Sequence, residues 1–264
     1  MNKKIAIVTG GTSGIGKATA LALRGAGYTV YEFSRREAGV EGLHHIRADI
    51  TDETQVRAAV QQVMDAEGQI DVVVNNAGFG ISGAVEFTDT ADAQRLFNAD
   101  FFGMVRVNRA VIAHMRAAGR GRIVNLSSVA GPLPIPFQTY YSAAKAAVNA
   151  YTMALANELR PFGITVCAVQ PGDIHTGFTA AREKTVTGDE VYGGRISRSV
   201  SRMEHDEQTG MPPEKAAAFL CRVALRCRTK PLYAIGPQYS AAVLLGRLLP
   251  CRLVSWIVSK LYAA

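Results

Sequence analysis

The sequence predicts a doubly wound α/β domain, with about seven parallel strands and helices on both faces of the sheet. Short apolar, β-branched runs alternate with longer amphipathic segments along the chain. Parallel neighbours need crossovers, and right-handed crossovers through helices cover both faces of a sheet. The strands are expected at Ile5–Val8, Thr29–Phe33, His44–Arg47, Val72–Val74, Arg122–Leu126, Thr165–Val169 and Leu232–Ile235. The helices are expected at Ile15–Arg24, Glu53–Ala66, Ala91–Met115, Ser142–Leu159 and Pro213–Arg226.

We expect residues 1–264 to form one Rossmann-type domain, because no Pro/Gly/Ser-rich linker separates the strand–helix units. Residues 177–210 are polar and rich in Arg, Ser and Gly, which favours a mobile substrate-loop insertion. Residues 241–264 form an apolar tail that basic residues and Pro250 interrupt, so no run reaches the roughly 20 apolar residues that span a bilayer. Two short amphipathic helices are expected there. They could cover a substrate pocket, form a dimer interface or lie on a membrane surface.

Composition narrows the class of protein. The chain has 264 residues, of which 48% are hydrophobic and 19% are charged, as is typical of a soluble globular domain. The formal net charge is +7, which favours an anionic ligand. The basic residues are dispersed and do not form the long runs of a nucleic-acid-binding tail. A phosphorylated small molecule is therefore the expected ligand, and nucleic acid is not expected.

The cysteines and histidines indicate neither a disulfide framework nor a metal site. No Cys-x-x-Cys pair occurs, and the five histidines show no ligand spacing. The N-terminal segment lacks the apolar h-region and cleavage site of a secretion signal. A reduced, cytoplasmic protein is expected. The four cysteines are Cys167, Cys221, Cys227 and Cys251.

A glycine-rich turn follows the first expected strand and opens the first expected helix. It reads Thr9-Gly10-Gly11-Thr12-Ser13-Gly14-Ile15-Gly16. Glycines let the backbone turn sharply and approach a pyrophosphate, while the helix N-terminus supplies a positive field for the phosphates. Because a strand precedes the turn and a helix follows it, the turn predicts a dinucleotide-binding site.

The end of the second expected strand predicts which dinucleotide binds. An acidic residue there would accept hydrogen bonds from the ribose 2′-hydroxyl of NAD. This chain has Ser34 at that position, followed by Arg35 and Arg36, whose guanidinium groups can pair with a 2′-phosphate. Glu32 and Glu37 fall on the wrong side of the strand end or beyond it. NADP is therefore the expected cofactor.

Tyr141 and Lys145 are four residues apart in an expected helix, and Ser128 ends an expected strand thirteen residues before Tyr141. Residues i and i+4 share one helix face, so the ammonium group can stand beside the phenol. A neighbouring cation lowers the pKa of a tyrosine, which makes it a better acid–base group. Taken alone, such a pair is more often an amphipathic edge with an extended lysine. With the hydroxyl of Ser128, it predicts a proton donor, a cation and a hydroxyl around one carbonyl.

Six motifs occur in order between Lys4 and about Thr176. They are Thr9-Gly10 with Gly14-Ile15-Gly16, Asp49-Ile50, Asn75-Asn76-Ala77-Gly78, Ser128, Tyr141 with Lys145, and Pro171-Gly172 with Ile174 and Thr176. Together they resemble the single-domain, Tyr-x-x-x-Lys branch of the short-chain dehydrogenase/reductase superfamily. The resemblance implies that Asp49 and Ile50 lie at the adenine and that the Asn75–Gly78 turn, with Asn76 and Ala77, braces the sheet and the cofactor. It also implies nicotinamide carboxamide contacts from Pro171, Gly172, Ile174 and Thr176.

The resemblance also implies a mechanism. Ser128 would hydrogen-bond the substrate oxygen, and Tyr141 would give or take the hydroxyl proton. Lys145 would lower the pKa of Tyr141 and hold the nicotinamide ribose, while hydride passes between NADP(H) and a secondary alcohol or ketone carbon. Ser127 and Tyr140 are neighbouring alternatives. Only Tyr141 lies four residues before Lys145, and the family places its serine where Ser128 stands.

One position departs from the family's pattern. Asp100 stands where an asparagine usually completes a catalytic tetrad by holding a water molecule that contacts the lysine. Asn98 lies about 200° away around a helix and cannot substitute. Asp100 is expected to accept the same hydrogen bond while adding a negative charge. That charge would stabilise the ammonium group of Lys145 and weaken its effect on Tyr141.

The substrate is expected to be a lipophilic alcohol or ketone. Residues 132–137 are apolar and should line one wall of the pocket, while Phe178, Tyr192 and Met203 of the 177–210 insertion could close it. The resemblance is strongest to family members that act on steroids, retinoids and other lipophilic carbonyls, and it implies a homodimer or homotetramer. The alternative is a catalytically impaired, NADP-binding sensor or scaffold of the same fold, which the departure at Asp100 keeps open.

Overall fold

The computed structural model describes residues 3–226 and 228–263, so Met1, Asn2, Cys227 and Ala264 lie outside it. Seven strands form one sheet in the order β3-β2-β1-β4-β6-β7-β9, and every neighbouring pair is parallel. All seven strands are those that the sequence predicts. Their bounds are β1 Lys4–Thr9, β2 Tyr28–Ser34, β3 His44–Arg47, β4 Val72–Asn75, β6 Gly121–Leu126, β7 Ile164–Gln170 and β9 Leu232–Ala234.

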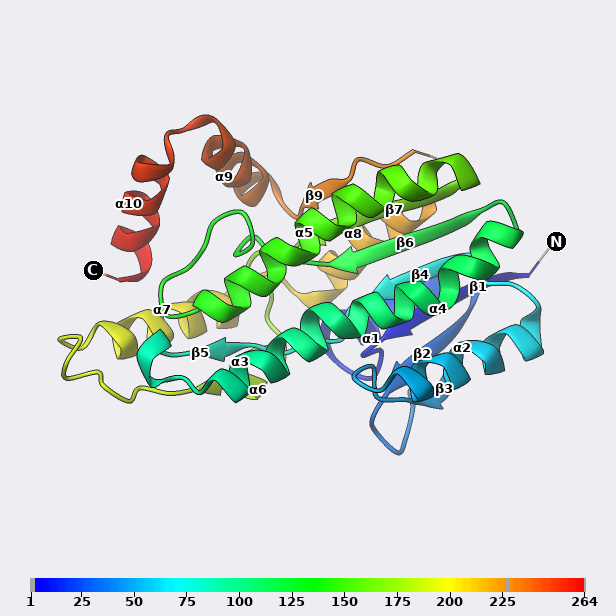
Figure 1. The fold of residues 1–264 in the computed structure, drawn as a ribbon, viewed down its shortest axis with the longest axis horizontal. Coiled ribbons are helices and arrows are strands. Elements are labelled where there is room, and N and C mark those ends of the chain that lie inside the picture. The colour runs from blue at the N-terminus through cyan, green and yellow to red at the C-terminus, as the bar shows by residue number, and fades with distance from the viewer. Residues whose placement is uncertain (1–2, 227, 264) are drawn as a thin grey trace.

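Helices cover both faces of this sheet, as predicted for a doubly wound fold. Figure 1 looks onto the face that α2, α4 and α5 cover, with α1 and α8 behind the sheet. Alternate residues of β1 serve the two layers, because Ile5 and Ile7 pack under α2 and α4 while Ala6 and Val8 pack under α1 and α8. The bounds of these helices are α1 Gly14–Gly25, α2 Glu53–Glu67, α4 Met104–Ala117, α5 Thr139–Leu159 and α8 Pro213–Leu225.

The order of the strands fixes where a ligand can bind. The chain moves outward from β1 through β2 to β3 and then returns to β4 on the other side of β1. A crevice opens at such a switch point, outside the carboxyl ends of the strands. The glycine-rich turn after β1, the turn after β4 and the segments after β6 and β7 all leave the sheet at this edge.

The helix expected at Ala91–Met115 is interrupted. The structure has α3 Thr90–Phe97, a π-helical turn at Asn98–Gly103, and then α4. The wider turn changes which side chains face the sheet, so a helical wheel drawn through the segment is wrong here. Asp100 is 3% exposed within the turn and points into the protein.

The stretch 177–210 contains more regular structure than its composition indicates. It holds α6 Phe178–Ala181, the short strand β8 Glu183–Lys184 and α7 Arg195–Gln208. β8 pairs with β5 Ile81–Ser82 in a separate two-stranded sheet. α7 is not among the helices that the sequence predicts. Its apolar stripe of Ile196, Val200 and Met203 is buried, although polar residues dominate the helix.

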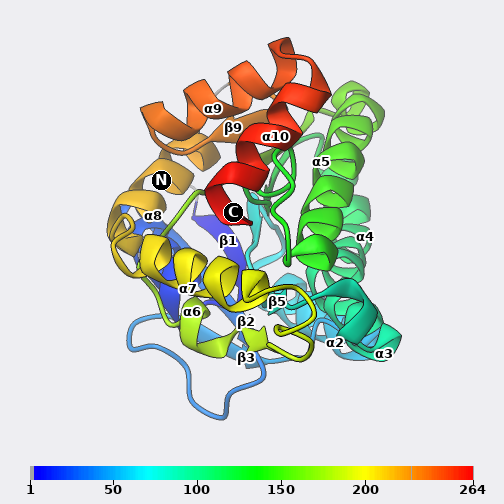
Figure 2. The same ribbon diagram turned by 90° about the vertical axis from the view of Figure 1, so that its left-hand side faces the viewer.

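The tail forms the two short helices that the sequence predicts, α9 Pro237–Leu248 and α10 Cys251–Tyr262. They begin at Pro237 and after Pro250, where proline suits the first turn of a helix. Figure 2 shows both at one end of the molecule, with the end of α10 beside α7. Within the described residues, no helix is long and apolar enough to cross a membrane. Two 3₁₀ turns, Val85–Phe87 and Arg160–Phe162, complete the elements.

Candidate active site

A cavity of about 930 Å³ opens at the carboxyl edge of the sheet, at the predicted switch point. It brings together nearly every residue that the sequence nominates for catalysis and cofactor binding. These lining residues are Gly10, Thr12, Ser13, Gly14, Ile15, Ser34, Arg35, Arg36, Asp49, Ile50, Asn76, Ala77, Gly78, Asp100, Ser128, Tyr141, Lys145, Pro171, Gly172, Ile174 and Thr176. Gly16 is the exception and lies behind the turn.

The glycine-rich turn is built for a close approach of backbone to ligand. Gly10 and Gly14 have φ of +65° and +51°, a region that glycine enters without strain. A Cβ at Gly16 would collide with the carbonyl oxygen of Gly10 and the side chain of Asn76. Asn76 in turn donates from Nδ2 to the carbonyl oxygen of Thr9 at 3.0 Å, which ties the turn after β4 to the end of β1. This packing holds the N-terminus of α1 open toward the cavity.

The end of β2 presents a hydroxyl and two cations to the cavity. The Oγ of Ser34 is buried and has no hydrogen-bond partner in the described structure. Arg35 and Arg36 are exposed, and Arg36 donates to the carbonyl oxygen of Thr12 at 3.5 Å. The second arginine therefore already lies against the phosphate-binding turn. These groups fit a phosphorylated ribose better than an unmodified one.

Neither Glu32 nor Glu37 lies where an acidic residue at the end of β2 would bind the ribose 2′-hydroxyl of NAD. Glu32 is fully buried, pairs with His45 and lies against Gly11, so its carboxylate does not line the cavity. Glu37 pairs with Arg47 at 2.8 Å. Both carboxylates therefore lie away from the ribose-binding position, as the sequence predicts.

Ser128 and Tyr141 line the cavity; Ser127 lines it as well, whereas Tyr140 does not. The Oγ of Ser127 donates to the backbone carbonyl of Lys145 at 3.0 Å and so joins β6 to α5. The Oγ of Ser128 accepts from the backbone N–H of Ala130 at 3.1 Å. Tyr141 is 9% exposed and faces the cavity from the first turn of α5. The hydroxyl proton of Ser127 is therefore engaged by α5, and Tyr140 does not reach the cavity, so the choice of Ser128 and Tyr141 stays a prediction that this geometry favours.

Lys145 and Asp100 form a buried ion pair with 2.9 Å between Nζ and Oδ2. The sequence predicts a water-mediated contact here, so the direct pair is a correction. The other oxygen, Oδ1, accepts from the backbone N–H of Phe79 at 2.9 Å and ties the turn after β4 to the pair. Lys145 Nζ also donates to the carbonyl oxygen of Leu126 at 3.3 Å and lies 5.4 Å from the ring centre of Tyr141. The π-helical turn makes this contact possible, because it directs Asp100 inward.

Asn98 does not enter this ion pair. Its Oδ1 accepts from Nη2 of Arg106 at 2.8 Å, eight residues along the chain. This agrees with the prediction that Asn98 cannot take the place of Asp100.

Burial raises the pKa of Tyr141, and the Asp100 carboxylate raises it further, while Lys145 and the Ser128 hydroxyl lower it. The net direction is upward because burial and Asp100 outweigh Lys145, whose own effect is the lowering that the sequence predicts. Burial disfavours the ammonium form of Lys145, but Asp100 and Tyr141 stabilise that form, and the pKa of Lys145 is raised. The site therefore holds a protonated phenol beside a charged lysine at neutral pH. That arrangement suits a proton donor.

One wall of the cavity is apolar. Ile135, Phe178 and Met203 line it, and the rings of Phe178 and Tyr141 lie 5.9 Å apart. Most of the expected 132–137 wall does not line the cavity. Phe137 and Tyr192 pack against each other with ring centres 5.6 Å apart, so Tyr192 is not part of the wall either. These two aromatic residues instead support α7.

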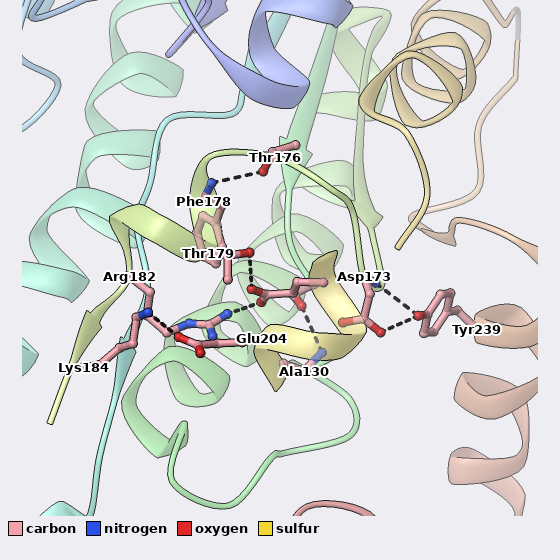
Figure 3. A network of polar contacts seen from close by, with 11 residues as sticks. Ala130, Asp173, Thr176, Phe178, Thr179, Arg182, Lys184, Glu204 and Tyr239 are labelled. Atoms are coloured by element: carbon pink, nitrogen blue, oxygen red, sulfur yellow. Dashed lines mark hydrogen bonds and ion pairs between the residues drawn. The ribbon is translucent and has the colours of Figure 1, made fainter. Parts of the chain in front are cut away.

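Besides Glu183, which pairs with Arg95 at 2.6 Å, two carboxylates that the sequence does not nominate line the cavity. Asp173 accepts a hydrogen bond from the Tyr239 hydroxyl at 2.5 Å, which Figure 3 shows. Glu207 accepts from Thr179 at 2.7 Å and pairs with the buried Arg182. Burial raises the pKa of both carboxyl groups. Asp173 stands inside the Pro171–Thr176 motif, and that position is the one signal that could have revealed it.

Metal binding finds no support among the described residues. No group of three or more His, Cys, Asp or Glu side chains there could hold a metal ion. Cys167 and Cys221 are buried free cysteines, Cys251 is an exposed one, and Cys227 lies outside the described residues.

A phosphate-binding turn, a paired lysine and a buried phenol at one switch point define an oxidoreductase that uses a nicotinamide cofactor. The family model for short chain dehydrogenases matches residues 4–187, and the chain belongs to that family. The 3-ketodihydrosphingosine reductase of Bacteroides thetaiotaomicron is 41% identical over 242 residues, covering 90% of this chain and 89% of the relative.

Solved structures agree with this assignment. A short-chain dehydrogenase from Streptomyces avermitilis superposes with a TM-score of 0.85 at 31% identity, covering 98% of this chain and 97% of that one. ElxO with NADP bound superposes with a TM-score of 0.75 at 28% identity, covering 91% of this chain and all of that one, 100%.

Proposed function

We propose that this protein reduces the ketone of a long-chain 2-amino ketone of the 3-ketodihydrosphingosine type, with NADPH as the reductant. The observation that carries the reductive direction is the buried Tyr141 phenol, which Asp100 and burial keep protonated beside the charged Lys145. A ketone needs a proton at its oxygen when it is reduced, and this phenol faces the cavity. The relative from Bacteroides thetaiotaomicron supports the choice of substrate.

The proposed roles follow from where each side chain lies. The Ser128 hydroxyl holds the carbonyl oxygen, and the Tyr141 phenol donates its proton to that oxygen. Lys145 stabilises the phenolate that remains, and Asp100 keeps Lys145 charged and in place. Bound NADPH would supply the hydride from the nicotinamide end, beside Pro171–Thr176. Its adenosine phosphate would lie against Ser34, Arg35 and Arg36.

The apolar wall and the carboxylates of the cavity fit the alkyl chain and the amine of such a substrate. Ile135, Phe178 and Met203 offer apolar contact to a long alkyl chain. Asp173 and Glu207 offer carboxylates to an ammonium group, and Arg182 offsets the charge of Glu207 more closely than that of Asp173. An amine next to the ketone therefore suits this cavity better than a plain ketone does. We also propose a homodimer or homotetramer, from the family resemblance.

NADPH oxidation by the full-length protein tests the function. The panel is 3-ketodihydrosphingosine, a plain 3-ketone of equal chain length, and a short water-soluble ketone. We expect kcat/KM for the amino ketone to exceed that for the plain ketone by about tenfold, the value of one charge-assisted hydrogen bond. Tight NADPH binding without turnover of any ketone would instead favour the sensor alternative.

Cofactor preference is tested separately at the end of β2. Ser34→Asp should lower the ratio of kcat/KM for NADPH to that for NADH by about tenfold or more, because its carboxylate repels the 2′-phosphate. Arg35→Ala should lower the same ratio by removing a phosphate partner. Arg57→Ala, on the exposed face of α2, is the control for loss of one positive charge. An unchanged ratio in both Ser34→Asp and Arg35→Ala would contradict the NADP assignment.

A further inference from the structure

The two C-terminal helices bury very little of their apolar surface. Val243 is the buried residue of α9, and Val258 is the buried residue of α10. On α10, Val254, Val258 and Tyr262 repeat at helical spacing on the covered side. A second set of large apolar side chains points to solvent, and we call it the α9–α10 surface. It comprises Leu244, Leu245, Leu248, Leu253, Trp256, Ile257 and Leu261.

This surface is exposed to a degree that is unusual for large apolar residues. Leu248 is 72% exposed and Trp256 is 58% exposed. On each helix these residues recur three or four positions apart and so share one face, and the two helices follow each other at one end of the molecule (Figure 2). Grouped apolar side chains on a protein surface indicate a partner or a membrane.

All charged side chains on α9 and α10 are basic, while Asp206 of α7 lines a hollow together with Leu261 and Tyr262. Arg247, Arg252 and Lys260 are exposed among the apolar residues, and none forms an ion pair with a carboxylate in the part of the chain that the structure describes. No acidic residue follows Glu214 in the sequence. Eight basic residues follow Glu214, so the rest of the chain carries a net charge of −1 and the whole chain +7; they are Lys215, Arg222, Arg226, Arg228, Lys230, Arg247, Arg252 and Lys260.

An anionic bilayer complements this surface better than a second copy of the chain does. In a symmetric dimer the same patch meets itself, so Arg247, Arg252 and Lys260 would come close to the same cations of the second copy. An amphipathic helix with apolar residues, tryptophan and basic residues binds the boundary between lipid headgroups and acyl chains. Anionic headgroups supply the opposite charge.

The surface also adjoins the cavity. Tyr239 of α9 and Tyr262 of α10 line the cavity from their inner sides, and Gly246 packs against Leu133 of the loop before α5. We infer that the α9–α10 surface docks on an anionic lipid bilayer and so places the cavity beside the membrane. A lipophilic substrate that resides in the bilayer could then reach the cavity without crossing water. The docking itself does not depend on which ketone is reduced.

Trp256 provides a direct readout, because it is the single tryptophan of the chain. The full-length protein is mixed with phosphatidylcholine vesicles, or with vesicles in which roughly a third of the lipid is phosphatidylglycerol. We expect a blue shift of Trp256 emission and cosedimentation with the anionic vesicles. The partition coefficient should exceed that for neutral vesicles by at least about tenfold and fall as salt is added.

Two double variants separate the apolar and charged parts of the surface. Leu248→Ser with Leu253→Ser should abolish the blue shift, and Arg247→Glu with Arg252→Glu should lower binding to anionic vesicles by at least about tenfold. Val191→Ser is the matched apolar control, since Val191 is also 72% exposed. Arg57→Glu with Arg109→Glu is the matched charge control, on α2 and α4. Turnover of the short water-soluble ketone checks that each variant is folded.

Equal binding to neutral and anionic vesicles would overturn the proposal. So would loss of binding in the matched controls to the same degree as in the test variants. Light scattering covers the remaining possibility. If the wild type binds no vesicles while Leu248→Ser with Leu253→Ser converts an oligomer to a monomer, the surface is a subunit interface and the proposal fails.

Discussion

Tyr141→Phe is expected to lower kcat for ketone reduction by about 10²–10⁴-fold, the usual contribution of a positioned proton donor. The ring remains in place, so its packing on Phe178 and its distance from Lys145 should be preserved. Only the O–H group is lost, and with it the proton for the carbonyl oxygen. NADPH affinity, measured by fluorescence titration, should stay within about threefold of the wild-type value.

Tyr140→Phe is the matched control, because Tyr140 precedes Tyr141 on α5 and does not line the cavity. Its kcat should equal that of the wild type. Turnover of Tyr141→Phe within a few fold of the wild type would show that another group delivers the proton. In that case the role assigned to the phenol is wrong, even if the cofactor assignment holds.

Asp100→Asn is expected to shift the pH dependence of catalysis. The Asp100 carboxylate raises the pKa of Tyr141, so removing its charge should lower that pKa. Reduction needs the protonated phenol and is lost as pH rises through this pKa. The alkaline limb of kcat for reduction should therefore move to lower pH. Oxidation of the product alcohol needs the phenolate, so the acidic limb of kcat for oxidation should move to lower pH as well.

Asp100 acts through Lys145 and Tyr141, which makes it a positioning residue, and the pH profile separates this role from a structural one. A loss of stability alone would lower the amount of active protein without moving either limb. Asp92→Asn, on the exposed face of α3, is the control for loss of a carboxylate. If the limbs of Asp100→Asn stay in place or move to higher pH, the carboxylate does not set the pKa of Tyr141.

Local patterns predicted the fold because short-range physics sets them. The apolar runs of β1 and β4 fill both faces of a sheet, and period and propensity reveal such runs without knowledge of the tertiary structure. Backbone geometry alone requires glycine at positions 10 and 14, where φ is positive, whereas Gly16 is also required by its close approach to Asn76. The spacing of Tyr141 and Lys145 is local as well, since residues four apart share one helix face wherever the helix lies.

Tertiary packing decided the chemistry at the same positions. The π-helical turn and the fold of the chain bring Asp100 within 2.9 Å of Lys145, although the two residues are 45 positions apart. Burial then raises the pKa of Tyr141, which reverses the effect that Lys145 would have alone. Asp173 and Glu207 meet at the cavity for the same reason, because α7 folds back over the end of β7.

The sequence by itself determined the alternating α/β fold, the phosphate-binding turn, and the hydroxyl, phenol and lysine of the active site. Only the tertiary structure decided how acidic the phenol is, which carboxylates share the cavity, and which face of the tail stays exposed. The physical reason is that side-chain spacing is a local property of a helix or strand. Desolvation and ion pairing depend instead on residues that are far apart in the chain.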